Sequence, residues 1–248
     1  MATNRIAVIL AAGMGKRMNS TLPKVLCPAK RRPLVDYVLD VLDKLDVQKQ
    51  IVVVGYRAED VKAALSPRKR VEFALQTEQL GTGHAVMMAK EQLSGHEGPV
   101  LVLAGDSPMT QVSSLEAIFA EYDKNHPACI LGTLKKENPH GLGRIVRDVN
   151  GEFDSIVEEK DASDSQRKIT EVNMSTYLFH GPDLLWALGQ LTNQNQQKEY
   201  YLTDCPGLMK RAGKTVKALP VLKPCEALSV NTPDELRLVE IEMERLGY

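Results

Sequence analysis

The chain has 248 residues and a formal net charge of −1, and 43% of its residues are hydrophobic. This near-neutral charge excludes a global field that would attract nucleic acid or an anionic membrane, and no apolar run approaches the roughly 20 residues of a membrane span. The four cysteines, Cys27, Cys129, Cys205 and Cys225, form no C-x-x-C pair. This scatter excludes a zinc or dithiol motif and predicts reduced thiols in a cytoplasmic protein.

Short apolar runs alternate with helical patterns through the first half of the chain. We predict strands over residues 6–10, 51–54, 71–75 and 100–103, and helices over residues 34–45, 59–65 and 83–93. Continuous apolar strands are typical of a parallel sheet that is buried on both faces. The alternation therefore predicts an α/β fold with a doubly wound, mostly parallel, Rossmann-like sheet, whose ligands lie at the carboxyl ends of the strands.

The second half has a looser pattern. It predicts helices over residues 115–122, 181–191, 202–212 and 233–246, and strands over residues 128–134, 144–147, 153–157 and 172–179. Asn150-Gly151 between two of these strands indicates a hairpin. Asn231-Thr232-Pro233 gives the last helix a threonine cap and a proline in its first turn.

The loop after the first strand has the features of an anion site. It contains the sequence Leu10-Ala-Ala-Gly-Met-Gly-Lys-Arg-Met18, followed by Leu22-Pro-Lys-Val-Leu26. Gly13 and Gly15 allow backbone N–H groups to approach an anion. Lys16, Arg17 and Lys24 can offset the charge of a polyphosphate. We therefore predict a triphosphate-binding loop, with a simple tight turn as the alternative.

Two better-known phosphate motifs do not match this loop. A P-loop requires glycine where Leu10 stands, and a serine or threonine where Arg17 follows Lys16. The dinucleotide fingerprint G-x-G-x-x-G fails because Met18 replaces the third glycine. This mismatch disfavours an NAD-linked oxidoreductase.

The loop sequence resembles the signature of sugar-1-phosphate nucleotidyltransferases. Gln76-Thr-Glu-Gln-Leu-Gly-Thr-Gly-His-Ala85 is similar to the base-recognition segment of the uridylyltransferases that make UDP-N-acetylglucosamine. Further motifs follow in the family's order: Gly105-Asp106, Gly141-Leu-Gly-Arg-Ile145, Ile156-Val-Glu-Glu-Lys-Asp161, Glu171-Val-Asn173, Glu199-Tyr-Tyr-Leu-Thr-Asp204 and Val230-Asn231. The resemblance covers nearly the whole chain. It implies Mg²⁺-dependent transfer of a uridylyl group from UTP to N-acetylglucosamine-1-phosphate, with release of pyrophosphate.

The resemblance also implies a role for each matching residue. The catalytic residues would be Arg17, Lys24 and Asp106, and Mg²⁺ would be held by Asp106 and Asn231. The nucleotide would be bound by Leu10, Ala11, Ala12, Gly13, Gly15, Lys16, Gln76, Gly81, Thr82 and Gly105. The sugar would be bound by Gly143, Glu158 and Asn173. A glutamine offers a donor and an acceptor that can match a uracil edge, whereas we expect a structural role for His84.

We expect a single nucleotidyltransferase domain over residues 1–248. Its nucleotide-binding core comprises about residues 1–110 and 216–248, and about residues 111–215 form a sugar-facing subdomain. The sequence leaves open whether the chain forms a homo-oligomer, and whether a further C-terminal domain exists.

Four positions depart from the family's pattern. Asn173-Met174-Ser175 replaces Asn-Thr-Gly, while Ala104 and Leu142 each stand where a tyrosine is common. These departures leave open another sugar-1-phosphate, or dTTP in place of UTP. A non-catalytic nucleotide-sugar-binding protein is a further alternative, which the joint presence of Lys24, Asp106 and Asn231 disfavours.

Overall fold

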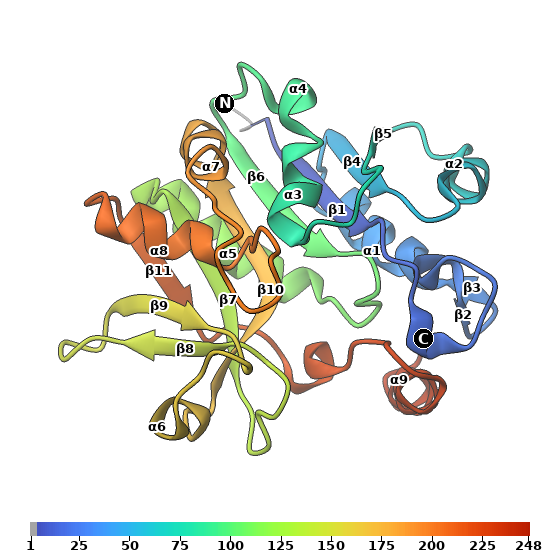
Figure 1. Cartoon of the computed structure of the whole chain (residues 1–248). Helices are drawn as coiled ribbons and strands as arrows, with labels where there is room; N and C mark the ends of the chain where they lie inside the picture. Colours follow the sequence, from blue (N-terminus) through green and yellow to red (C-terminus); the bar gives the residue numbers. More distant parts are fainter. Residues whose placement is uncertain (1–3) are drawn as a thin grey trace.

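The structure is a computed structural model that describes residues 4–248 (Figure 1). Its helices are α1 (Leu34–Lys44), α2 (Ala58–Leu65), α3 (Thr82–Met87), α4 (Lys90–Leu93), α5 (Val112–Asn125), α6 (Asp164–Arg167), α7 (Gly181–Leu188), α8 (Asp204–Arg211) and α9 (Pro233–Arg245). Its strands are β1 (Ile6–Ala11), β2 (Pro28–Ala29), β3 (Arg32–Pro33), β4 (Lys49–Val54), β5 (Val71–Leu75), β6 (Pro99–Ala104), β7 (Cys129–Lys135), β8 (Arg144–Arg147), β9 (Phe153–Val157), β10 (Glu171–His180) and β11 (Val216–Leu219). Short 3₁₀ helices span Lys16–Met18, Lys24–Leu26 and Pro224–Ala227.

The main sheet has the strand order β11-β7-β10-β6-β1-β4-β5. β1 runs parallel to β4 and β6, and β4 runs parallel to β5. β10 is antiparallel to both of its neighbours, β6 and β7. The β8–β9 hairpin extends from β10 and projects from the sheet (Figure 1). The predicted doubly wound, mostly parallel α/β fold is therefore confirmed.

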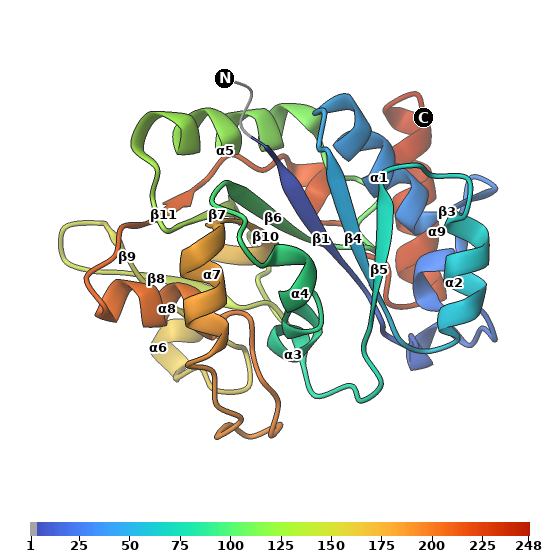
Figure 2. The ribbon, with the colours of Figure 1, turned by 90° about the horizontal axis from the view of Figure 1, so that it is seen from above.

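Helices cover both faces of the sheet, as Figure 2 shows from above. α1 and α5 lie on one face, where Ala7 and Ile9 of β1 join the buried cluster. α3, α4, α7 and α8 lie on the other face, where Ile6 and Val8 point. Successive side chains of a strand point to opposite faces, so a strand covered on both sides must be apolar throughout. This requirement explains the uninterrupted apolar run in β1.

Three features differ from the sequence-based expectation. The predicted helix over residues 83–93 is divided into α3 and α4, because the Ala89 N–H bonds to the Val86 carbonyl in a tighter i to i+3 turn. β7 and β10, from the proposed sugar-facing subdomain, are strands of the main sheet, in which β10 pairs directly with β6 of the core. β11, which the sequence analysis did not identify, pairs in parallel with β7 at the sheet edge. Within residues 4–248, no helix has the length and apolarity to cross a membrane.

Candidate functional site

A cavity of about 310 Å³ opens at the carboxyl ends of β1, β5 and β6. It is lined by Leu10, Ala11, Ala12, Gly13, Lys24, Val25, Gln76, Gln79, Gly81, Thr82, Ala85, Ala104, Asp106, Ser175 and Glu199. Nine of the residues predicted to bind nucleotide or to act in catalysis are among them: Leu10, Ala11, Ala12, Gly13, Lys24, Gln76, Gly81, Thr82 and Asp106. Residues of the loop after β1, of the segment after β5 and of the turn after β6 thus line one cavity at the carboxyl ends of the strands, where this fold is expected to bind its ligands.

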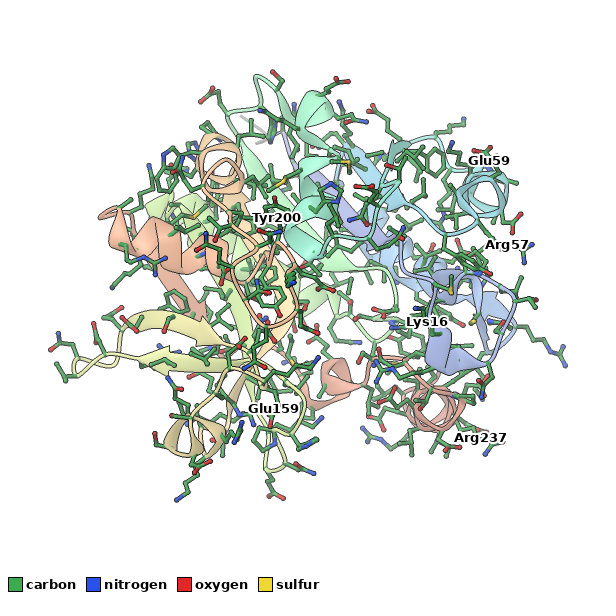
Figure 3. The ribbon with its side chains drawn as sticks, in the orientation of Figure 1. Lys16, Arg57, Glu59, Glu159, Tyr200 and Arg237 are labelled. Atoms are coloured by element: carbon green, nitrogen blue, oxygen red, sulfur yellow. The ribbon has the colours of Figure 1, made fainter. Side chains whose placement is uncertain are left out.

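The loop after β1 borders this cavity. No atom lies within 4 Å of the position that a Cβ on Gly13 would occupy, so the space in front of this backbone is open. Glycine is required at position 15 for a different reason. Its φ is +67°, and a Cβ there would lie 2.7 Å from Cβ of Lys24. Lys16 and Arg17 are exposed on the outer part of the loop, where Lys16 is labelled in Figure 3, and they do not line the cavity.

Lys24 connects the two predicted metal ligands. Its ammonium forms an ion pair with the Asp106 carboxylate and donates a hydrogen bond to Oδ1 of Asn231 at 2.7 Å. Only 15% of the Lys24 side chain and 19% of the Asp106 side chain are exposed, so water screens this pair weakly. Three groups from distant parts of the chain thus meet at one point beside the cavity.

Backbone contacts explain why these groups meet. The Gly105 N–H donates to the Leu10 carbonyl at 2.9 Å, which holds the turn after β6 against β1. The Val230 N–H donates to the Asp106 carbonyl at 3.3 Å. The Asn231 N–H donates to the Glu235 carboxylate at 2.6 Å, within the capping box that begins α9. The predicted threonine cap of this helix is confirmed, and it fixes the residue next to Asn231.

The donor set suits Mg²⁺. This ion prefers oxygen ligands and is often held by one or two protein groups together with phosphate oxygens and waters. Asp106 and Asn231 offer a carboxylate and an amide oxygen, and the ammonium of Lys24 between them shows that the position favours a cation. Within residues 4–248, no group of three or more His, Cys, Asp or Glu side chains is placed to hold a metal. An ion held here would therefore take its remaining ligands from substrate and water.

The side chain of Gln76 is buried at the opposite end of the cavity. Its Nε2 donates to the Gly81 carbonyl at 3.2 Å and lies 3.0 Å from Nδ1 of His84. These contacts hold the amide in one orientation, which gives His84 a structural role of the kind we expected. Oε1 of Gln76 is left for a ligand in this orientation.

The segment after residue 198 closes this end of the cavity. The Gly83 N–H donates to the Tyr200 carbonyl at 2.7 Å, and the Leu202 N–H donates to Oγ1 of Thr82 at 3.1 Å. A Cβ on Gly81, whose φ is +108°, would lie 2.6 Å from the same Tyr200 carbonyl. Gly81 is therefore required by close packing against this segment, and Tyr200 is labelled beside α3 in Figure 3.

Several lining residues were not predicted as site residues, namely Val25, Gln79, Ala85, Ala104, Ser175 and Glu199. Glu199 begins the motif Glu199-Tyr-Tyr-Leu-Thr-Asp204, and this motif could have identified it as a site residue. Ala104 and Ser175 were noted only as departures from the family's pattern. Their place on the cavity wall shows that a departure from a pattern can itself mark a site.

The three predicted sugar-binding residues lie together outside this cavity. The Asn173 N–H donates to the Gly143 carbonyl at 2.8 Å, and a Cβ on Gly143 would lie 3.6 Å from Oε1 of Glu158. Nδ2 of Asn173 donates to the Tyr177 hydroxyl at 2.6 Å. Glu158 lines a second cavity of about 300 Å³, which also includes Asp204.

The Glu158 carboxyl has a perturbed acidity. Burial raises its pKa above the ordinary value, and the negative charge of nearby Asp204 raises it further. A hydrogen bond from the Thr203 hydroxyl acts in the opposite direction and lowers the pKa. Burial likewise raises the pKa of Asp204. A carboxylate whose ionised form is penalised by burial is suited to accept hydrogen bonds from substrate hydroxyls.

The arrangement favours phosphate chemistry. The larger cavity combines an open glycine backbone, a lysine and an aspartate, and its lining includes no histidine or cysteine. The four cysteines are all free and buried away from it. A site of this composition can position anions and offset their charge.

Comparisons with known proteins agree with this composition. A family model described as the MobA-like NTP transferase domain matches residues 7–196. The bifunctional protein GlmU of Lactococcus lactis subsp. lactis is 41% identical over 242 residues, which cover 98% of this chain and 52% of that protein. The GlmU of Bacillus licheniformis is 42% identical over 241 residues, or 97% of this chain and 52% of that protein. The chain thus spans about half the length of these curated relatives.

Solved structures show the same fold. A UDP-glucose pyrophosphorylase complexed with UDP-glucose superposes with a TM-score of 0.79 at 17% identity, covering 98% of this chain and 99% of that one. HddC from Yersinia pseudotuberculosis has a TM-score of 0.69 at 17% identity, covering 96% of this chain and 99% of that one. At these identities the likeness establishes the architecture.

Proposed function

We propose a uridylyltransferase activity for this chain, which belongs to the family of MobA-like NTP transferase domains and is thus a nucleotidyltransferase. The proposed reaction joins UTP to N-acetylglucosamine-1-phosphate and gives UDP-N-acetylglucosamine and pyrophosphate. One observation carries the proposal: Lys24 lies in the nucleotide cavity in contact with both Asp106 and Asn231. The likeness to a UDP-glucose pyrophosphorylase supports a nucleotide-sugar product.

The chemistry is an in-line displacement. An oxygen of the sugar phosphate attacks the α-phosphorus of UTP, a new P–O bond forms, and the bond to the pyrophosphate oxygen breaks. The attacking phosphate is already ionised, so the protein needs no general base. The protein's contribution is to position two anions and to offset the charge that spreads in the transition state.

The residues of the chain divide this work. Lys24 contacts phosphate oxygens near the reacting centre, while Arg17 and Lys16 reach the leaving phosphates from the exposed loop. The N–H groups around Gly13 donate to the triphosphate across the open space in front of them. When bound at Asp106 and Asn231, Mg²⁺ would neutralise phosphate charge and help to orient the two substrates.

The two ends of the site select the substrates. Oε1 of Gln76 accepts a hydrogen bond from the uracil edge, because Nε2 is already engaged by Gly81 and His84. Glu158 accepts hydrogen bonds from sugar hydroxyls, and the side-chain amide of Asn173 donates to them. Gly143 has no side chain and leaves room beside both residues. Free, buried cysteines are typical of reduced proteins, which supports a cytoplasmic site of action.

The test is pyrophosphate release with Mg²⁺, with each nucleoside triphosphate paired with a panel of sugar-1-phosphates. We expect release with UTP and N-acetylglucosamine-1-phosphate, and a loss of about 100-fold or more in Asp106→Ala. Asp164→Ala is the matched control, because the Asp164 side chain is 97% exposed on α6. Release with a different sugar or with dTTP would contradict the substrate assignment. A folded protein that binds UTP but releases nothing with any pair would contradict catalysis.

A further inference from the structure

Ser175 has an unusual backbone conformation. Its φ is +54°, in the left-handed region that favours glycine. Within residues 4–248, the other non-glycine residues with positive φ lie in loops, turns or helix caps, whereas Ser175 lies inside strand β10. The pairing of β10 with β7 shifts register at this point, between Asn173 and Thr176. Strain at such a position is typical of functional sites.

The strained residue lies on the wall of the nucleotide cavity, together with Ala104 of β6. The printed pairing of β10 with β6 ends with Tyr177 opposite Val102, so Ser175 and Ala104 each lie two residues beyond it on their own strands. Both residues line the cavity, where alanine contributes only a methyl group to the wall and Ser175 contributes a hydroxyl.

Ser175 also connects the cavity with the predicted sugar residues. Its N–H donates to Oδ1 of Asn173 at 3.3 Å, and Asn173 lies against Gly143 and Tyr177. The Ser175 hydroxyl itself forms no hydrogen bond in the part of the chain that the structure describes. The protein therefore tolerates a strained serine whose polar group has no structural partner.

We propose that the Ser175 hydroxyl is a specificity-determining contact to the sugar moiety, at the point where it joins the nucleotide. This inference rests on the proposed function, because it assigns the hydroxyl to the sugar-phosphate end of that site. Glycine would relieve the strain, and alanine would retain it without the hydroxyl. The two substitutions thus separate the role of the hydroxyl from the role of the backbone.

The experiment measures the dissociation constants of UDP-N-acetylglucosamine and of UDP by calorimetry, together with the melting temperature. Ser175→Ala should weaken UDP-N-acetylglucosamine about 3- to 10-fold, as expected for one neutral hydrogen bond, with UDP unchanged. Ser175→Gly should show the same loss and a melting temperature higher by about 2–4 °C, because the strain is released.

His126→Gly is the matched control. His126 also has positive φ, at the carboxyl end of α5, where the chain enters β7 at the opposite edge of the sheet from the cavity. This variant should raise the melting temperature without changing either dissociation constant. Both glycine variants should thus relieve backbone strain, but only Ser175→Gly should weaken the binding of UDP-N-acetylglucosamine.

Two results would overturn the inference: an unchanged affinity for UDP-N-acetylglucosamine in Ser175→Ala, or an equal loss for UDP, which would place the hydroxyl on the nucleotide. A wild-type protein that binds neither ligand would overturn the inference together with the proposed function. If the wild-type enzyme releases pyrophosphate and Ser175→Ala binds UDP-N-acetylglucosamine as tightly as the wild type, the inference about Ser175 is wrong and the proposed function stands. If the wild type makes no product but Ser175→Ala weakens the binding of UDP-N-acetylglucosamine and not of UDP, the proposed reaction is wrong and the inference about Ser175 stands.

Discussion

Lys24 and Asp106 form an ion pair beside the nucleotide cavity, and the same ammonium donates to Oδ1 of Asn231 at 2.7 Å. The lysine therefore stands between the two groups that we propose as metal ligands. A divalent cation bound to both groups would repel an ammonium at this distance. If Asp106 and Asn231 held the metal, the ammonium of Lys24, which also lines the cavity, would be available to contact phosphate oxygens.

The first prediction concerns Lys24→Met, which retains an unbranched side chain but removes the charge. In the absence of nucleotide, Mn²⁺ should bind about tenfold more tightly, because the competing ammonium is gone. Pyrophosphate release should nevertheless fall by about 100-fold or more, because a phosphate contact is lost. Electron paramagnetic resonance of free Mn²⁺ measures the affinity. Lys44→Met, at the end of α1, serves as the charge-matched control. Weaker Mn²⁺ binding in Lys24→Met would rule out the competition.

The second prediction concerns base selection by Gln76. Gln76→Ala removes the amide whose Nε2 is held by Gly81 and His84. The preference for UTP over CTP should fall by about tenfold, since the hydrogen bond that Oε1 accepts from the base edge is lost. Competition among triphosphates in the pyrophosphate assay measures this preference. Gln92→Ala is the control, because Gln92 donates to the Phe73 carbonyl outside the cavity. An unaltered preference in Gln76→Ala would move base recognition elsewhere.

The third prediction follows from the raised pKa of Glu158. Burial penalises the ionised carboxylate in the folded protein, whereas the unfolded chain ionises at the ordinary value. Below that value both states are protonated and Glu158→Gln should have little effect on stability. As pH rises through the ordinary value and then the raised folded value, the wild type loses stability relative to Glu158→Gln.

Melting temperatures at pH 4 and pH 7.5 test this sign. Glu158→Gln should gain stability over the wild type only at the higher pH, while its affinity for the nucleotide sugar falls. Glu116→Gln, on the exposed side of α5, should show no such dependence on pH. A stability gain that is equal at both pH values would show that ionisation is not its cause.

The sequence was sufficient to predict the parts of the fold that depend on local pattern. β1 and residues 51–54 of β4 are continuous apolar runs because helices cover both faces of these strands. The start of α9 follows from Thr232, whose side chain caps the helix, and from Pro233, whose fixed φ suits the first turn. The edge of the sheet at which ligands gather follows from the direction of parallel strands.

Contacts between distant segments could not be predicted in this way. Lys24 and Asn231 are 207 positions apart, and no spacing rule indicates that their side chains touch. β11 is a four-residue strand that is stabilised by pairing with β7, so its own pattern is too short to identify it. Gly81 lines the cavity as predicted for a nucleotide contact, but the close packing of Tyr200, which leaves no room for a Cβ there, could not be predicted from the sequence.

The last prediction concerns the cap of α9. Oγ1 of Thr232 accepts from the Glu235 N–H at 3.2 Å, and the Glu235 carboxylate accepts from the Asn231 N–H at 2.6 Å. Thr232→Ala should lower the free energy of unfolding by about 1 kcal/mol, the usual cost of losing such a cap. Because the same box positions Asn231, the Mg²⁺ concentration needed for half-maximal activity should also rise by a few fold.

Urea unfolding and a Mg²⁺ titration of pyrophosphate release measure the two effects. Ser163→Ala is the matched control, because Ser163 caps α6 through the same kind of box with Gln166, away from the proposed metal ligands. It should loosen α6 and leave the Mg²⁺ requirement unchanged. If Thr232→Ala loses stability but retains the wild-type Mg²⁺ requirement, then the cap does not position Asn231 for the metal. Asn231 would then owe its orientation to Lys24, which donates to its amide oxygen.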